Sequence, residues 1–229
     1  MRKTVMSNDK TVEAFTQYAA DYDQWFDSPE GRILFQIEVG AVRLLMKGLE
    51  HPFLEVGVGT GRFAYELGID FGIDPSARAL EIAKKRGIKV KNAKGEKLPF
   101  EDGCFGSVFL LFTLCFVDDP LMVLSEVRRV LKKGGSLIVG FINKDSAWGK
   151  LYAKKGKEGH PIYRHARFYS FNEVKKMIRN SSMEVEACSS TLFQSPSDRP
   201  YMEPALKGLI PGAGFVCIRS RKTDNPGGK

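Results

Sequence analysis

The residues best suited by type and spacing to do chemistry are three glycines at alternate positions, Gly57, Gly59 and Gly61. They follow an acidic residue inside a short apolar run, Phe53 to Val56, which predicts a buried strand. Glycine has no Cβ and tolerates positive φ, so a ligand can lie against the bare main chain where the strand ends. A helix that begins at this bend points its amino terminus at the same place. The pattern predicts a site for a nucleotide-like ligand at the carboxyl end of the strand.

The spacing of the glycines separates the kinds of nucleotide-like ligand. A dinucleotide-binding loop reads G-x-G-x-x-G, and Arg62 occupies the place of its third glycine here. A phosphate-binding loop needs Gly-Lys-Ser or Gly-Lys-Thr, and neither follows these glycines. A nicotinamide-dependent oxidoreductase is therefore disfavoured. The alternative that the glycines only form a tight turn stays open at this point.

A second acidic residue, Asp74, closes the next predicted strand, 17 positions after Gly57. In nucleotide-binding α/β sheets an acidic residue at this place accepts hydrogen bonds from ribose hydroxyls. Asp74 also precedes Pro75 and Ser76, so it can instead favour the amino terminus of the helix that follows. The spacing from the glycine loop favours the ribose role.

A regular alternation of strands and helices positions these residues. Five strands are expected in this part of the chain, at residues 52–56, 69–74, 88–92, 105–111 and 136–142. Helices at 11–26 and 32–49 precede them, and an antiparallel strand pair at 184–193 and 215–219 follows. The predicted fold class is α/β: a doubly wound, mostly parallel seven-stranded sheet, Rossmann-like, with N-terminal helices and a C-terminal antiparallel pair.

We expect residues 1–222 to form a single domain. It would comprise an N-terminal helical cap (1–50), a cofactor-binding half (51–142), an acceptor-side half (143–222) with a basic insertion (143–168), and a flexible tail (223–229).

The composition of the 229 residues, 43% hydrophobic and 27% charged, is typical of a soluble globular protein. No signal peptide is expected, and no apolar run approaches the roughly 18 residues of a membrane span. The four cysteines are far apart, which predicts free thiols in a reducing cytoplasm. With three scattered histidines they form no metal-ligand pattern. We expect a cytoplasmic protein with no metal.

The net charge of +8 is concentrated in residues 144–179, which hold ten Lys or Arg against three Asp or Glu. Such a segment can recognise a carboxylate, a phosphate, a nucleic acid or an anionic membrane surface. It can also be only the solvated face of an insertion. Two motifs of enzymes that modify nucleic-acid bases, Asn/Asp-Pro-Pro-Tyr/Phe and Pro-Cys, are absent, so nucleic acid is the less favoured partner.

The motif acidic-x-Gly-x-Gly-x-Gly resembles motif I of class I S-adenosylmethionine-dependent methyltransferases. The segments Glu96–Asp102, with its Leu-Pro-Phe, and Glu126–Gly135 resemble the small-molecule type, the group that includes ubiquinone and menaquinone biosynthesis methyltransferases. The resemblance covers roughly residues 14–140 and, more weakly, 168–187. It implies methyl transfer from S-adenosylmethionine to a small acceptor, anionic or aromatic, with S-adenosylhomocysteine as product.

The resemblance also assigns roles to matching residues. Glu55 would lie near the methionine amino group, and Asp74 would hold the ribose. Gly95 and Glu96 would border the adenine. The full cofactor-binding set that it implies is Tyr22, Glu55, Val56, Gly57, Gly59, Gly61, Asp74, Pro75, Gly95, Glu96, Leu111 and Phe112.

Aromatic residues are the candidates for the acceptor pocket, although each can equally belong to the core. They are Trp25, Phe26, Phe116, Trp148 and Tyr152, with Tyr163 and Phe193 as further candidates. No catalytic triad is expected, because in-line methyl transfer needs mainly alignment and exclusion of water.

Three positions depart from the family pattern. Lys94 stands where an acidic residue is usual, and Glu96 would have to replace it. Gly106 replaces an aspartate at the start of the fourth strand, and Cys115 begins the pair that replaces a frequent His-His. These departures keep an alternative open: a non-catalytic relative that binds a nucleoside and acts on RNA or a protein partner through its basic segment.

Overall fold

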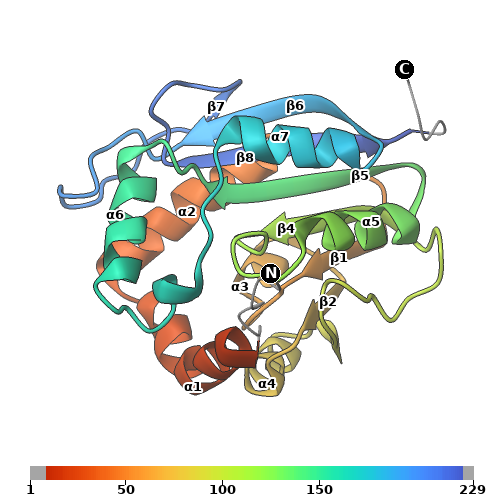
Figure 1. The fold of residues 1–229 in the computed structure, drawn as a ribbon, viewed down its shortest axis with the longest axis horizontal. Coiled ribbons are helices and arrows are strands. Elements are labelled where there is room, and N and C mark those ends of the chain that lie inside the picture. Colours follow the sequence, from red (N-terminus) through yellow and green to blue (C-terminus); the bar gives the residue numbers. More distant parts are fainter. Residues whose placement is uncertain (1–8, 224–229) are drawn as a thin grey trace, which may run out of the picture.

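An eight-stranded sheet organises the computed structural model, which describes residues 9–223 (Figure 1). The strand order is β3-β2-β1-β4-β5-β8-β6-β7. The strands β1 to β5 run parallel, while β8 pairs antiparallel with both β5 and β6. The bounds are β1 Phe53–Val56, β2 Phe71–Asp74, β3 Lys89–Asn92, β4 Phe105–Leu111, β5 Leu131–Ile142, β6 Met183–Thr191, β7 Leu206–Lys207 and β8 Phe215–Lys222.

Helices cover both faces of the sheet. Buried side chains of α2 and α3 pack on one face and those of α5 and α7 on the other, and Figure 1 shows α5 and α7 in front of the strands. The bounds are α1 Asp9–Trp25, α2 Pro29–Arg43, α3 Arg62–Leu67, α4 Ala77–Lys85, α5 Pro120–Val130, α6 Ala147–Lys157, η1 Tyr163–His165 and α7 Phe171–Asn180. Side-chain oxygens cap five of the helices, which satisfies backbone N–H groups that a helix leaves free.

The predicted fold class is confirmed, with corrections to the elements. The seven expected strands are present, and an eighth, β7, forms where Leu206 and Lys207 pair with β6 inside the proline-containing segment. The second helix ends at Arg43, six residues earlier than expected, and turns follow as far as Gly48, whose φ is 76°. The strand β5 begins at Leu131 because this residue is extended and pairs with Phe105.

The basic insertion contains regular structure that its composition does not predict. Ser146 caps α6, and η1 follows. Gly156 lies within α6 where a Cβ would be 2.6 Å from the carbonyl oxygen of Tyr163, so the absence of a side chain lets α6 and η1 approach closely. Of the tail expected to be flexible, residues 224–229 lie outside the described part of the chain.

The glycine at the start of β4 has a packing reason. A Cβ on Gly106 would overlap the carbonyl oxygen of Glu50 and lie 2.8 Å from that of His51. Its backbone N–H donates to the carbonyl of Pro52 at 3.1 Å, which brings the segment before β1 against β4. The residue that departs from the family pattern therefore serves close contact between two backbones.

We expect Gly106→Ala to lower the free energy of unfolding by about 1–3 kcal/mol, because a Cβ there displaces backbone atoms. Chemical denaturation measures this. Gly40→Ala is the matched control: it lies inside α2 with nothing within 4 Å of an added Cβ, so alanine should stabilise by up to about 1 kcal/mol. Equal effects of the two substitutions would contradict the packing role of Gly106.

Candidate functional site

The turn after β1 is shaped by Gly57, whose φ is 79°. Its N–H and that of Val58 both donate to the carbonyl of Ile73, at 2.8 and 2.9 Å, which ties the turn to β2. The Thr113 hydroxyl donates to the carbonyl of Val56 at 2.7 Å and occupies the space that a Cβ on Gly57 would need. A side chain at position 57 is thus excluded both by backbone conformation and by Thr113.

The other two glycines of the motif have different surroundings. A Cβ on Gly59, at φ 50°, would meet nothing within 4 Å, so this residue presents bare backbone to open space. A Cβ on Gly61 would instead lie 3.0 Å from the Cβ of Ala83 on α4. Gly61 therefore allows α4 to pack against the start of α3.

A cavity of about 140 Å³ opens at the carboxyl ends of β1, β2 and β4, beneath α1. We call it the cofactor cavity, after the ligand that the sequence predicts there. Gly61 is not among its lining residues. The other expected cofactor residues all line it: Tyr22, Glu55, Val56, Gly57, Gly59, Asp74, Pro75, Gly95, Glu96, Leu111 and Phe112.

Asp74 is held rigidly at the end of β2. Its Oδ2 accepts a hydrogen bond from the N–H of Gly59 at 3.0 Å, and its Oδ1 accepts one from the N–H of Ser76 at 2.8 Å. Burial raises the pKa of this carboxyl, and the two hydrogen bonds oppose the rise. Each oxygen keeps a lone pair for a further donor. The carboxyl thus has a structural function and can also accept bonds from ligand hydroxyls.

Two further carboxyls in the cofactor cavity have unsatisfied oxygens. The Oε2 atoms of Glu55 and Glu96 are buried and accept no hydrogen bond within the described residues. Burial, followed by the charge of Asp74, raises the pKa of Glu55 well above its ordinary value. The Oε1 of Glu96 accepts a bond from the N–H of Asp118 at 3.0 Å. Since buried acceptors without partners are costly, this cavity is suited to a ligand that carries amino groups.

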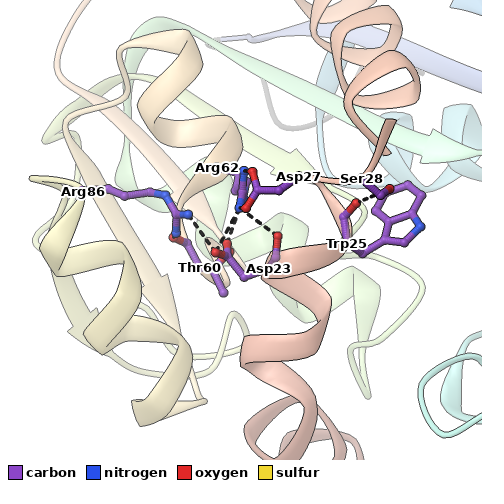
Figure 2. A network of polar contacts seen from close by, with 7 residues as sticks. All are labelled: Asp23, Trp25, Asp27, Ser28, Thr60, Arg62 and Arg86. Carbon is purple, nitrogen blue, oxygen red and sulfur yellow. Dashed lines mark hydrogen bonds and ion pairs between the residues drawn. The ribbon is translucent and has the colours of Figure 1, made fainter. Parts of the chain in front are cut away.

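The helix α1 forms the roof of this cavity and is fixed there by charge. Asp23 accepts hydrogen bonds from Arg62 on α3 at 2.9 Å and from Arg86 after α4 at 2.8 Å (Figure 2). Burial alone would raise the pKa of Asp23, but the bonds from the two arginines lower it to about 2. Arg86 also donates to the carbonyl of Thr60 in the glycine turn. The ion pairs of Asp23 therefore connect α1 to the glycine turn.

A second cavity, of about 350 Å³, adjoins the first and is also lined by residues of α1. We call it the acceptor cavity. It shares an aromatic wall with the cofactor cavity, formed by Phe15, Tyr22, Phe26, Phe112 and Phe116. Phe112 reaches this position through a left-handed backbone, with φ 58°, and its ring stacks on Phe215. Positive φ is unfavourable for such a residue, so the packing around it must hold it there.

Most of the aromatic residues expected to surround an acceptor line this cavity: Trp25, Phe26, Phe116, Tyr152 and Tyr163. Trp148 does not. Its ring is in the core, where its Nε1 donates to the carbonyl of Gln194 at 2.9 Å. Phe193 also lies outside the lining and packs on the core of the opposite sheet face. Both are corrections to the expected pocket.

Glu38 on α2 is a lining residue that the sequence reasoning missed. It is only 8% exposed, and burial raises its pKa to about 8. A signal was available, because position 38 lies on the same helical face as Leu34, Ala41 and Leu45. A glutamate on an apolar helix face is unusual enough to mark a candidate functional residue.

Cys115, at the position of the family's frequent histidine, also lines the acceptor cavity. Its thiol donates to the carbonyl of Phe112 at 3.1 Å, and burial raises its pKa to about 12. It therefore stays a neutral thiol. Across residues 9–223, no group of three or more His, Cys, Asp or Glu is placed to hold a metal ion. No helix in this range is long and apolar enough to cross a membrane.

Comparison with known proteins places this geometry among methyltransferases. Residues 54–139 match the family model described as a methyltransferase domain. An uncharacterised protein of Mycobacterium tuberculosis is 47% identical over 201 residues, 87% of this chain and 70% of that protein. The demethylmenaquinone methyltransferase of Staphylococcus aureus is 30% identical over 182 residues, 73% of this chain and 69% of that enzyme.

Solved structures of methyltransferases are also similar to this chain. A Thermotoga maritima protein described as a SAM-dependent methyltransferase, possible histamine N-methyltransferase, is 38% identical with a TM-score of 0.86, over 93% of this chain and all of that one. Geranyl diphosphate C-methyltransferase of Streptomyces coelicolor, solved with S-adenosyl-L-homocysteine, has a TM-score of 0.64 at 16% identity, over 93% and 98% of the two chains. At 16% identity, the similarity to the Streptomyces enzyme shows a shared fold alone.

Replacing Arg62 should release α1. Arg62→Met leaves Asp23 without its main partner, so the free energy of unfolding should fall by about 2–4 kcal/mol. Hydrogen exchange should speed up in α1 more than in α5. Arg43→Met is the control, since Arg43 pairs with Glu66 at a site where the arginine is 52% exposed, and it should cost at most about 1 kcal/mol. Similar losses in the two variants would contradict the anchoring role.

The buried carboxyl of Glu38 should make the free energy of unfolding depend on pH. A raised pKa in the folded state gives stability that is full below the unfolded pKa near 4.5 and is lost as pH rises through about 8. Glu38→Gln removes this loss. As pH rises from about 5 to about 9, the melting temperature of Glu38→Gln should therefore increase by several degrees relative to that of the wild type. Parallel profiles in thermal unfolding would show that Glu38 is not buried in this way.

Proposed function

Because the chain belongs to the class I S-adenosylmethionine-dependent methyltransferases, we propose that it transfers the methyl group of S-adenosylmethionine to a small-molecule acceptor. The observation that carries the proposal is the pair of cavities on either side of one aromatic wall. One cavity has the buried acceptor oxygens that suit the cofactor, and the other has room for a second molecule. The comparisons give no support to the alternative of a non-catalytic nucleoside-binding protein.

Three carboxyls would hold the cofactor. Glu55 is suited to its amino group and Asp74 to its ribose, while Glu96 can take the adenine amino group in place of the acidic residue that Lys94 replaces. Gly59 leaves space for close approach to the main chain. When bound, S-adenosylmethionine supplies an electrophilic methyl group on a positively charged sulfur.

The protein's own part in the reaction is to orient the methyl donor and the acceptor and to exclude water. Phe112, Phe116 and Tyr22 line both cavities, so a nucleophile in one would be held next to the methyl donor in the other among apolar side chains. Fixed orientation accounts for much of the rate enhancement in such displacements. A general base is required only for a nucleophile that still carries its proton.

The acceptor that we propose is small and has an apolar or aromatic body. The cavity volume of about 350 Å³ lies within the usual range for small-molecule sites. Its walls are mainly aromatic. The expectation of an anionic acceptor has weaker support, since Lys155 is the one lysine or arginine in the described lining and it is exposed.

The cavities also support the proposed division of residues 1–222. Residues of the 51–142 half contribute most of the cofactor cavity, while α1 and residues 152–174 contribute much of the acceptor cavity. We further propose a cytoplasmic location, because Cys104, Cys115, Cys188 and Cys217 are all free thiols.

Calorimetry tests the cofactor site with S-adenosylhomocysteine. Asp74→Asn should weaken binding by about 1–3 kcal/mol, since a charged acceptor is lost. Asp70→Asn is the matched control at the amino end of the same strand, where Asp70 accepts a bond from the N–H of Phe53 at 2.9 Å. It should leave the affinity unchanged. Absence of binding by the wild type at millimolar ligand would overturn the proposed function.

Transfer itself is tested with labelled cofactor. The protein, incubated with methyl-labelled S-adenosylmethionine and a metabolite extract, should give a labelled small molecule, and Asp74→Asn should give less of it. Including simple amines such as histamine covers the acceptor suggested by the description of the Thermotoga protein. Label found only in RNA or protein would contradict a small-molecule acceptor.

A further inference from the structure

Glu38 places a carboxyl group deep in the acceptor cavity with nothing to pair it. It lies in the second half of α2, is 8% exposed, and lines the cavity. Among residues 9–223 it forms no ion pair, and burial is the one cause of its raised pKa. Burial of a carboxyl without a partner is costly, so this residue is not explained by the packing of α2.

The groups that face Glu38 are neutral. Tyr22 from α1, Tyr152 from α6, Tyr163 from η1 and Cys217 from β8 lie close enough to feel its charge. Burial raises the pKa of each, so none is ionised near neutral pH. Within residues 9–223, aromatic rings, hydroxyls and a thiol therefore lie around this carboxyl, and no positive charge is paired with it.

The nearest basic side chains of the cavity are engaged elsewhere. Lys155 is exposed, and its Nζ lies 5.7 Å from the centre of the Tyr152 ring. His160 accepts hydrogen bonds at Nδ1 from the N–H groups of Ile162 and Tyr163, and burial lowers its pKa. Neither is positioned as a counter-ion for Glu38.

We propose that Glu38 binds the ammonium group of the acceptor, and that the acceptor is therefore a small amine with an apolar or aromatic body. This inference rests on the proposed function and adds the substrate class and the residue that selects it. An ammonium group satisfies a carboxylate by charge and by hydrogen bonding. The rings of Tyr22, Tyr152 and Tyr163 line the same cavity and are available for cation–π attraction. An anionic acceptor would gain no such pairing at the same place, and burial of its unpaired charge would be costly.

Binding of an amine should change the protonation state of Glu38. Before the amine binds, the carboxyl is largely protonated near neutral pH, because burial raises the pKa of Glu38 to about 8. Pairing with an ammonium group favours the carboxylate, so the proton on Glu38 must leave for the solvent. Binding of an amine should thus release about one proton per molecule at about pH 7. A neutral ligand of the same shape should release none.

Calorimetry on the protein saturated with S-adenosylhomocysteine tests this with three probes: 2-phenylethylamine, 2-phenylethanol and 3-phenylpropionate. Titrations in two buffers of different ionisation enthalpy report the protons released. The amine should bind roughly ten-fold or more tightly than the alcohol, and the acid most weakly. Glu38→Gln should lose both the preference and the proton release. Glu30→Gln, an exposed position on the same helix, should keep both.

The outcomes separate the two proposals. If S-adenosylhomocysteine does not bind to the wild type, the proposed function fails. If it binds equally to the wild type and Glu38→Gln, the variant is folded and the cofactor site is intact. Equal binding of amine and alcohol, binding of none of the three probes at millimolar concentration, or proton release that persists in Glu38→Gln would then overturn the role of Glu38 alone.

Discussion

The ion pairs of Asp23 are the interaction on which the site depends. They fix α1, an element from the start of the chain, over the carboxyl edge of a sheet formed much later in the sequence. Both cavities take part of their walls from α1, and Arg86 reaches from Asp23 to the backbone of the glycine turn. Without these contacts the glycine turn would remain, but the enclosed space beside it would open to solvent.

The two cavities are built from different kinds of element. The parallel strands bring Glu55, Asp74 and the backbone of Gly57 to one edge, where strand ends must meet. The acceptor side is assembled from helices, with α1, α2 and α6 contributing walls that strand order does not specify. This explains how one fold can keep its cofactor while acceptors differ, since the helical walls can change without disturbing the strands.

The sequence allowed prediction of features that depend on neighbours along the chain. The glycine turn and the strand ends are of this kind, and so is the position of Asp74. Features set by distant contacts were missed or misassigned. Trp148 was expected in the pocket, yet its Nε1 bonds to Gln194, 46 residues away. Arg62 served only to argue against a dinucleotide, and its partner on α1 could not be inferred. Glu38 was missed because the sequence does not show which side of the helix at 32–49 borders a cavity.

The aromatic wall that the two cavities share makes their occupancy interdependent. Phe15, Tyr22, Phe26, Phe112 and Phe116 each face both spaces. A ligand in one cavity that restricts the motion of these rings would leave less conformational entropy to lose when the other cavity is filled. We therefore expect each ligand to bind more tightly in the presence of the other, and by the same factor. The wall would in this sense be a thermodynamic link between the proposed methyl donor and its acceptor.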